Sequence, residues 1–252
     1  MSAAISASNP LQPCEQSGPP TLRVGGLTPL TTTDYPGQLA AVLFCQGCPW
    51  ACGYCHNPHL IPARSDNGRD WEHITGFLQR RRGLLDAVVF SGGEPLYQRG
   101  LDTAVTMVRD MGFRVGLHTG GSYPDHLQRL LPQLDWVGLD IKAPFDRYPQ
   151  VTGVPGSGER ARRSLEHLLA SDCDYEIRTT VHPLIFSPSG LRDLARQLAS
   201  LGVRHYVLQA FRDTGCMNSA YQQVSATSLL DSGLRDELQG LFEDFTIRGL
   251  AD

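Results

Sequence analysis

The sequence predicts an α/β fold built as a partial, TIM-like barrel of six parallel β/α units. Short apolar runs alternate with helical stretches along most of the 252 residues, and strands that alternate with helices form parallel sheets. Several runs are nearly continuous in Val, Leu, Ile and Phe, as expected for strands that are buried on both faces. Six units are too few for a closed eight-fold barrel, so we expect a partial (β/α)6 barrel.

The six strands are expected at the short apolar runs. In chain order they are Leu39–Cys45, Ala87–Ser91, Arg114–His118, Trp136–Ile141, Tyr175–Val181 and Arg204–Gln209. Parallel β/α folds place their chemistry at the carboxyl ends of the strands. The residues that directly follow each run are therefore the first place to look for a functional site.

Helices are expected in the intervals between these strands. Their predicted positions are Trp71–Arg82, Leu101–Met111, Pro124–Leu131, Gly158–Ser171 and Pro188–Leu201. In the last of these, leucines recur at steps of three and four residues and mark one apolar face: Leu191, Leu194, Leu198 and Leu201. Ser187-Pro188 and Ser157-Gly158-Glu159 are typical helix starts, and Gly112 and Gly202 are typical helix ends.

The two ends of the chain carry weaker patterns. The first 20 residues are rich in Ser, Pro, Ala and Gln and lack the basic start and apolar centre of a signal peptide. We expect residues 1–20 to be a mobile arm and residues 21–252 to form one domain. In the tail, Ser219–Asp252, we expect one further helix at Leu234–Phe242.

Composition argues against several classes of partner. The formal net charge is −4, with 19% charged residues, and gives no basic footprint for nucleic acid. No apolar run approaches the roughly 20 residues of a membrane span. We therefore expect neither a nucleic-acid nor a membrane partner.

The number of cysteines predicts the compartment. The seven cysteines are odd in number and lack a secretory context, so we expect the protein to lie in the reducing cytoplasm and to have no disulfide framework.

Three cysteines form the most informative pattern in the chain. Cys48, Cys52 and Cys55 follow the first predicted strand with the spacing C-x3-C-x2-C. Thiolates select iron–sulfur clusters, zinc or copper(I), and four of them would close a cubane 4Fe–4S cluster. Three would leave one iron open for a substrate, as an open position does in catalytic metal sites.

Other interpretations of these cysteines remain open. Cys45 and Cys48 form one C-x2-C pair, and Cys52 and Cys55 form another, but zinc ribbons separate such pairs by about 12 or more residues. A closed cluster that also uses Cys45 differs in order from the bacterial ferredoxin run. We expect Cys45 to end a buried strand as a small apolar residue. No role is predicted for the remaining cysteines, Cys14, Cys173 and Cys216.

The cysteine loop resembles that of the radical SAM enzymes, which cleave S-adenosylmethionine (SAM). The flanking residues resemble the activating enzymes of glycyl-radical proteins, and among them the branch that activates anaerobic ribonucleoside-triphosphate reductase. The segments that carry this resemblance are Asp34-Tyr-Pro-Gly37, Phe44-Cys-Gln-Gly-Cys48 and Cys55-His-Asn-Pro58. The resemblance implies a radical SAM-type barrel with Cys48, Cys52 and Cys55 as ligands of a 4Fe–4S cluster.

The second and third strands end in elements that this resemblance assigns to SAM. Gly92, Gly93 and Glu94 match the Gly-Gly-Glu element that contacts the amino group of SAM; a tight turn is the structural alternative. The third strand ends in His118-Thr-Gly-Gly121, where related activases carry Asp-Thr-Asn-Gly. Thr119 is kept, and we expect it to bind SAM. His118 replaces the Asp, which puts a cation site in doubt and leaves a satisfied polar histidine as the alternative.

The fourth and fifth strands carry charged residues in apolar surroundings. Asp140 and Lys142 should point to the same side of their strand, either as an ion pair or, as the resemblance implies, with Lys142 on the carboxylate of SAM. Arg178 matches an arginine that contacts SAM; a salt bridge with Glu176 is the alternative. A buried charge needs a partner or a ligand, so both interpretations are physically possible.

Residues around the cysteines and at the sixth strand complete the predicted site. Tyr54 is expected to pack on the adenine, and His56 and Asn57 to orient the cluster loop through hydrogen bonds; all three could equally be loop structure. The segment Gln209-Ala-Phe-Arg212 resembles the family's Gln-x-Phe-Arg and could contact adenine or pack in the core. No catalytic acid–base pair is predicted.

The resemblance implies that a reduced cluster cleaves SAM and that the radical formed takes a hydrogen from a glycine of a partner enzyme. The partner would be anaerobic ribonucleotide reductase, and a flavodoxin or ferredoxin would supply the electron, because no second cluster motif occurs in the sequence. Two alternatives remain: a radical SAM enzyme acting on a small molecule, such as a deazapurine synthase, and a non-catalytic iron–sulfur electron carrier.

Overall fold

The computed structural model describes residues 22–66, 68–222, 229 and 232–249. The predicted mobile arm, residues 1–20, lies outside the described residues, and so does Cys14. No helix in the described ranges is both long and apolar enough to cross a membrane.

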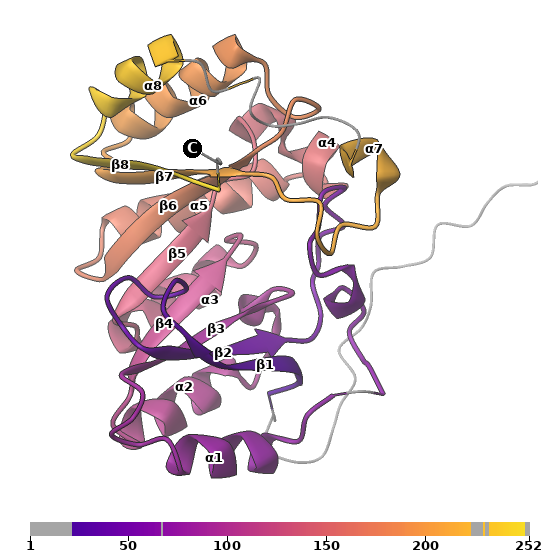
Figure 1. Ribbon diagram of the computed structural model, residues 1–252, viewed down its shortest axis with the longest axis vertical. Coiled ribbons are helices and arrows are strands. Elements are labelled where there is room, and N and C mark those ends of the chain that lie inside the picture. Colours follow the sequence, from indigo (N-terminus) through magenta and orange to yellow (C-terminus); the bar gives the residue numbers. More distant parts are fainter. Residues whose placement is uncertain (1–21, 67, 223–228, 230–231, 250–252) are drawn as a thin grey trace, which may run out of the picture.

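One curved sheet of eight strands runs through the molecule in the order of the sequence. The first pair of strands is antiparallel and the other neighbours are parallel. Figure 1 shows the sheet from β1 and β2 in its lower half to β8 near the top. The strands are β1 Val24–Thr31, β2 Ala40–Cys45, β3 Ala87–Gly92, β4 Arg114–Thr119, β5 Trp136–Asp140, β6 Asp174–Val181, β7 His205–Ala210 and β8 Asp244–Arg248.

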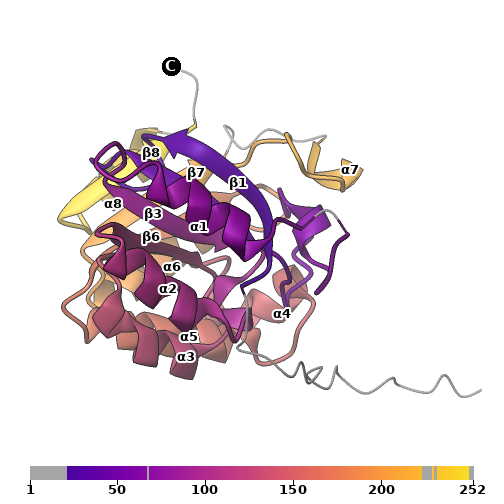
Figure 2. The same cartoon turned by 90° about the horizontal axis from the view of Figure 1, so that it is seen from below.

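The longer helices lie along one side of this sheet, and Figure 2 shows several of them side by side below the strands. Each turns its apolar face inward, as α6 does with the buried side chains of Leu191, Leu194 and Leu198. They are α1 Trp71–Gln79, α2 Leu101–Asp110, α3 Pro124–Leu130, α5 Ser157–Leu169, α6 Pro188–Ser200 and α8 Ser232–Gln239. The two short helices are α4 Tyr148–Thr152 and α7 Ser219–Gln222; both lie beyond the same end of the sheet, and Figure 2 shows them well apart from each other.

The predicted partial barrel is confirmed. All six predicted strands are present with ends within one residue of the expectation, and the five helices between them are present as well. Gly112 and Gly202 follow their helices with φ of 91° and 94°, which explains why these helices end there. Helix α1 stops three residues earlier than predicted, at Gln79, and α8 covers Ser232–Gln239 instead of Leu234–Phe242.

Two edge strands were not predicted. β1 contains Gly25, Gly26 and Pro29, residues that weaken a strand pattern, and its pairing with β2 has two register shifts. β8 has only five residues, and polar and apolar residues alternate in it. The sheet is thereby longer than six strands, but its edges β1 and β8 are not paired with each other among the described residues.

A small apolar cluster fills the face of the sheet that lies opposite the helices. It joins Tyr35 and Trp136, whose rings stack with centroids 5.3 Å apart, to alternate residues of β2 and β3, namely Ala40, Val42, Ala87 and Val89. Tyr35 is held by a turn in which Gln38 N donates to Tyr35 O over 3.2 Å and Gly37 has a φ of 72°. Pro36 and Gly37 suit the central positions of a type II turn.

Candidate functional site

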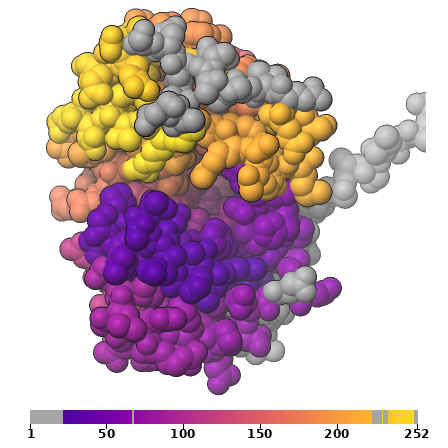
Figure 3. All heavy atoms as spheres, in the orientation of Figure 1, coloured from indigo at the N-terminus to yellow at the C-terminus, as the bar shows by residue number. Residues whose placement is uncertain are grey.

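A cavity of about 480 Å³ lies at the carboxyl ends of the strands. Residues from near both edges of the sheet line it, Thr33 and Asp34 after β1 and Arg248 and Gly249 at the end of β8. Figure 3 shows these two parts of the chain, in indigo and yellow, facing each other across a hollow on this side of the molecule. The structure brings all twelve predicted site residues to this cavity: Cys48, Cys52, Tyr54, Cys55, His56, Gly92, Gly93, Glu94, Thr119, Asp140, Lys142 and Arg178.

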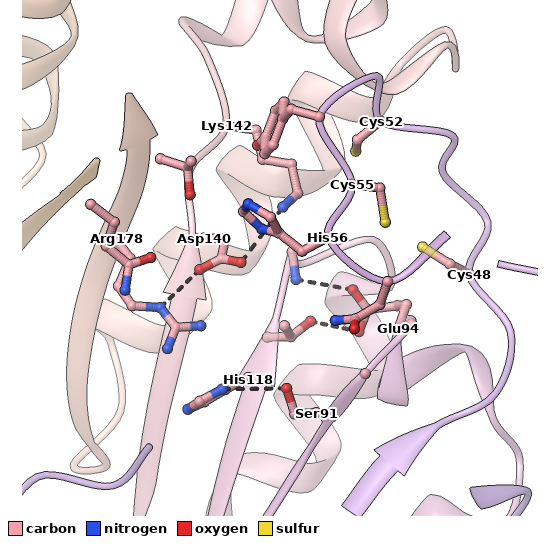
Figure 4. A pocket seen from close by; sticks show the side chains of 18 of the residues that line it. Cys48, Cys52, Cys55, His56, Ser91, Glu94, His118, Asp140, Lys142 and Arg178 are labelled. Atoms are coloured by element: carbon pink, nitrogen blue, oxygen red, sulfur yellow. Dashed lines mark hydrogen bonds and ion pairs between the residues drawn. The ribbon is translucent and has the colours of Figure 1, made fainter. Parts of the chain in front are cut away.

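The three predicted ligand thiols face the same space, as Figure 4 shows. All three are free cysteines. Cys45 differs from them: it ends β2, is fully buried in the apolar core and does not line the cavity, which agrees with its predicted role as a small apolar residue. The geometry therefore offers three thiols and not four.

Burial controls the protonation of these thiols. It raises the pKa of Cys48 to about 12 and also raises the pKa of Cys52 and Cys55, so a metal must displace protons to bind. Among the described residues, no three His, Cys, Asp or Glu side chains are placed to share one metal ion. Each cysteine ligand of a cubane binds a different iron, so the three thiols need not converge on a single point.

The cysteine loop, residues 46–57, is fixed by backbone hydrogen bonds. Gly47 N donates to Leu60 O (2.7 Å), and Cys48 N donates to Ile61 O (3.0 Å). The Gly-Gly-Glu turn packs directly against this loop. A Cβ on Gly92 would lie 2.5 Å from Cys45 N, and one on Gly93 would lie 2.4 Å from Gly47 O. The two glycines are therefore needed for this close contact, whatever else they bind.

Glu94 is buried, with 1% of its surface exposed, yet it lines the cavity. Its Oε1 accepts hydrogen bonds from the Thr119 hydroxyl (2.7 Å) and Leu96 N (3.1 Å), and its Oε2 accepts one from Gly120 N (3.0 Å). Burial raises the pKa of Glu94, and these donors oppose that rise. The carboxylate is thus held in one orientation at the cavity wall (Figure 4).

Asp140 lies between two cations. Arg178 Nε donates to its Oδ1 (2.8 Å), and Lys142 Nζ is 3.5 Å from its Oδ2. Burial raises the pKa of Asp140, but the two cations outweigh it and bring the pKa below its usual value. Burial would lower the pKa of Lys142, but Tyr54, whose ring lies 5.8 Å from Nζ, and Asp140 raise it. Lys142 is therefore charged, and the predicted ion pair is present beside the cavity.

Arg178 does not pair with Glu176, so that alternative is wrong. The Glu176 carboxylate instead accepts two hydrogen bonds from Arg248, over 2.8 and 2.6 Å. Arg248 belongs to β8, which the sequence analysis missed, and it also lines the cavity. The strand β8 has only five residues, in which polar and apolar residues alternate, and this pattern is too short to predict a strand or the position of Arg248.

His118 is a satisfied polar residue in this structure. Its Nε2 donates to Asp34 O (2.8 Å), and its Nδ1 is 3.3 Å from the Ser91 hydroxyl, which can donate to it. Burial lowers the pKa of His118 to about 3, with Arg178 contributing, so the ring is neutral. The bond to Asp34 also links the Asp34–Gly37 segment to the cavity, a role that the motif alone did not suggest.

The segment Phe211–Asn218, here called the cover segment, lies against the cysteine loop. His56 Nε2 donates to Arg212 O (2.8 Å), and the His56 and Phe211 rings stack with centroids 5.2 Å apart. A Cβ on Gly215 would lie 2.3 Å from His56 O. Of the Gln-x-Phe-Arg residues, Gln209 and Arg212 line the cavity, whereas Phe211 packs on the loop.

Comparison with known proteins agrees with this geometry. The model of the radical SAM superfamily matches residues 42–198, which include the cysteine loop and strands β3 to β6. The chain belongs to the radical SAM superfamily, and it is an enzyme of that class.

Two relatives and one solved structure extend the comparison. A Methanocaldococcus jannaschii protein, provisionally named a glycyl-radical enzyme activating enzyme, is 27% identical over 80% of this chain and 85% of its own length. The pyruvate formate-lyase-activating enzyme of Clostridium pasteurianum is 26% identical over 71% and 75%. Streptococcus suis SuiB bound to its precursor peptide shares the fold, with a TM-score of 0.64 at 12% identity over 82% of this chain. The match covers 48% of the SuiB chain, so this protein spans about half of it.

Proposed function

We propose that the protein is a glycyl-radical activating enzyme. It cleaves SAM reductively at a 4Fe–4S cluster held by Cys48, Cys52 and Cys55, and it leaves a glycyl radical on a partner enzyme. The single observation that carries the proposal is the set of three free thiols facing one cavity that is also lined by a buried carboxylate, Glu94, and a half-buried lysine, Lys142, while Cys45 points elsewhere. A carrier of electrons alone has no need of such a pocket.

Bound cluster and SAM supply the one-electron bond cleavage; the protein supplies binding and orientation. The ammonium group of SAM suits Glu94, because one acceptor position of its carboxylate stays open. The carboxylate of SAM suits Lys142, whose charge Asp140 only partly neutralises over 3.5 Å. Tyr54 is buried against the lysine and excludes water from this part of the cavity. No side chain needs to transfer a proton in this scheme.

We propose anaerobic ribonucleoside-triphosphate reductase as the partner. The support is the resemblance at Asp34–Gly37, His118–Gly121 and Gln209–Arg212, together with the activating enzymes among the relatives. The electron would come from a flavodoxin or ferredoxin, because the other described cysteines, Cys173 and Cys216, stand singly outside the cavity lining.

The test is anaerobic reconstitution with iron and sulfide, followed by metal analysis and electron paramagnetic resonance. The reduced protein should show a cubane signal and convert SAM to methionine and 5′-deoxyadenosine. Added to the reductase, it should produce a glycyl doublet that depends on SAM and on this protein. A protein that binds zinc, or that holds a cluster but does not cleave SAM, contradicts the proposal. Cleavage without a doublet on any glycyl-radical enzyme points instead to a small-molecule substrate.

A further inference from the structure

Thr119 ends β4 at the wall of the cavity, with 3% of its surface exposed. Its hydroxyl donates to Glu94 Oε1 over 2.7 Å and accepts a hydrogen bond from Gly121 N over 2.9 Å. A threonine hydroxyl has one proton to donate. Since the hydroxyl already donates this proton in its hydrogen bond to Glu94, Thr119 has no donor left for a bound ligand.

The hydroxyl is held in this direction by a chain of hydrogen bonds from helix α5. Ser164 Oγ donates to Gly121 O over 2.9 Å, and Gly121 N donates to Thr119. Ser164 is fully buried. Gly121 has a φ of 74°, and a Cβ there would lie 2.7 Å from Ser164 Cβ, so this position requires glycine. The chain thus runs from Ser164 through Gly121 and Thr119 to Glu94.

The acceptor positions of Glu94 are nearly all used. Each carboxylate oxygen has about two lone-pair sites. Among the described residues, Oε1 accepts from both Thr119 and Leu96 N, whereas Oε2 accepts only from Gly120 N. One acceptor site therefore remains, on Oε2. Rotation of the carboxylate would move this site, and the Thr119 hydroxyl is the side-chain group that prevents it.

We infer that Thr119 is a positioning residue for Glu94, which it holds through a hydroxyl fixed by Gly121 and Ser164, and that it donates no hydrogen bond to SAM itself. This changes the role expected from the sequence, where Thr119 was a SAM-binding residue. The inference rests on the proposed binding of the SAM ammonium by Glu94. It predicts that Thr119 matters only as long as residue 94 is a carboxylate.

The experiment measures the dissociation constant of SAM for the reconstituted, oxidised protein, in which no turnover occurs. Thr119→Val removes the hydroxyl at nearly constant shape and should weaken SAM binding about tenfold, the cost of about one buried hydrogen bond. Thr119→Ser keeps the hydroxyl and should stay within about threefold. In turnover, Thr119→Val should raise KM for SAM more than it lowers kcat.

Thr179→Val is the matched control. Thr179 is also fully buried in a strand and makes two side-chain hydrogen bonds, with Ile141 O and the Tyr206 hydroxyl, but it does not line the cavity. It should lose stability as Thr119→Val does, without any change in SAM affinity. Urea unfolding of all variants separates lost stability from lost affinity.

A double-mutant cycle with Glu94→Gln tests whether Thr119 affects SAM affinity through Glu94 or by direct contact with SAM. If Thr119 acts through Glu94, adding Thr119→Val to Glu94→Gln should change SAM affinity by less than about twofold. Full additivity would mean that Thr119 touches SAM directly and would overturn the inference. The inference would also be overturned if Glu94→Gln weakens SAM binding and Thr119→Val binds SAM with normal affinity. If Glu94→Gln has no effect, the proposed SAM site itself fails.

Discussion

Cys45 and Cys48 are three residues apart but belong to different environments. Cys45 is the last residue of β2 and points into the core between sheet and helices. Gly47, with a φ of 99°, turns the chain immediately afterwards and brings Cys48 to the cavity. The direction of each thiol is therefore decided by the end of one strand and one glycine. This direction is what separates a three-ligand site from a four-ligand one.

Alanine substitutions of the cysteines test this division. Cys48→Ala, Cys52→Ala and Cys55→Ala should each abolish the cubane signal, because each removes the thiol that would bind one iron. Cys45→Ala is the control and should keep a normal cluster, at a stability cost of about 1 kcal/mol for the small cavity it leaves. The measurements are electron paramagnetic resonance and iron content. Loss of the cluster in Cys45→Ala would mean that a fourth ligand exists.

His118 links protein stability to pH. Its pKa is about 3 in the folded protein, against about 6.5 for an unperturbed histidine, so below pH 6.5 the unfolded chain binds a proton that the folded one does not. Stability should therefore fall as the pH decreases from 6.5 towards 3, by up to about 1.4 kcal/mol per pH unit from this residue.

The variant His118→Gln should lose this slope. Urea unfolding of the metal-free, reduced protein at pH 7.0 and 5.5 measures it. We expect the variant to be less stable than the wild type at pH 7.0, because it loses the ring's two hydrogen bonds, but to lose less stability on acidification. An unchanged acid slope would show that the folded protein protonates His118 as readily as the unfolded chain does, and it would reopen the question of a charged site at the end of β4.

Much of the site could be predicted because its chemistry lies in short motifs at strand ends. The cysteines, Gly92 to Glu94 and the Asp140–Lys142 pair reach one cavity simply because parallel strands end together. Arg248 could not be found in this way, because its partner Glu176 lies on a different strand, 72 positions earlier in the sequence. The acceptor of His118, a backbone carbonyl at Asp34, leaves no mark in the sequence either.

At the scale of elements, the cysteine loop and the Gly-Gly-Glu turn form one packed unit. Gly93 N donates to Cys45 O, and Glu94 N donates to Gly47 O, both over 2.9 Å. Two elements whose bonded residues are 48 and 47 positions apart in the sequence therefore share hydrogen bonds as well as close contacts. A displacement of either element would move both the thiols and the Glu94 carboxylate.

Gly92→Ala tests the close contact within this unit, and Gly112→Ala is the matched control. Both glycines have a positive φ, 105° and 91°, but a Cβ on Gly112 meets nothing within 4 Å, whereas one on Gly92 meets the Cys45 backbone. Gly112→Ala should cost about 1 kcal/mol of stability and keep the cluster. Gly92→Ala should cost about 3 kcal/mol, because overpacking adds to the strain, and should reduce iron content. Equal effects in urea unfolding and iron analysis would contradict the contact.

The elements themselves were predicted unevenly, for physical reasons. Strands buried on both faces are apolar along their whole length and stand out in the sequence. β1 and β8 lie at the edges, where Gly, Pro and polar residues serve to limit pairing with other chains, and the same residues hide the strand pattern. The part of the cavity that these edges supply was hidden for the same reason.

At the scale of the molecule, the cover segment connects the end of β7 to the cysteine loop. Its contacts with that loop include the His56–Arg212 hydrogen bond, the stacked His56 and Phe211 rings and the close approach of Gly215. The order of the cover segment should therefore follow that of the cysteine loop.

Removal of the cluster with a chelator should loosen these two segments together. Hydrogen exchange, followed by mass spectrometry, should become faster in residues 46–57 and 211–218. Peptides from β2 to β7 should keep their protection and serve as the internal control. Faster exchange throughout the chain would mean that the metal stabilises the whole fold, and faster exchange in the cysteine loop alone would show that the cover segment is fixed independently.

A closed barrel of eight strands has an interior just wide enough for its own side chains. Here the same number of strands remains unclosed among the described residues, with the antiparallel strand β1 at one rim and β8 at the other. Residues next to both rims consequently line the cavity: Thr33 and Asp34 after β1, and Arg248 and Gly249 at the end of β8. For the glycyl-radical partner proposed above, a bend of its chain laid against this cavity would not have to thread through a closed ring of strands.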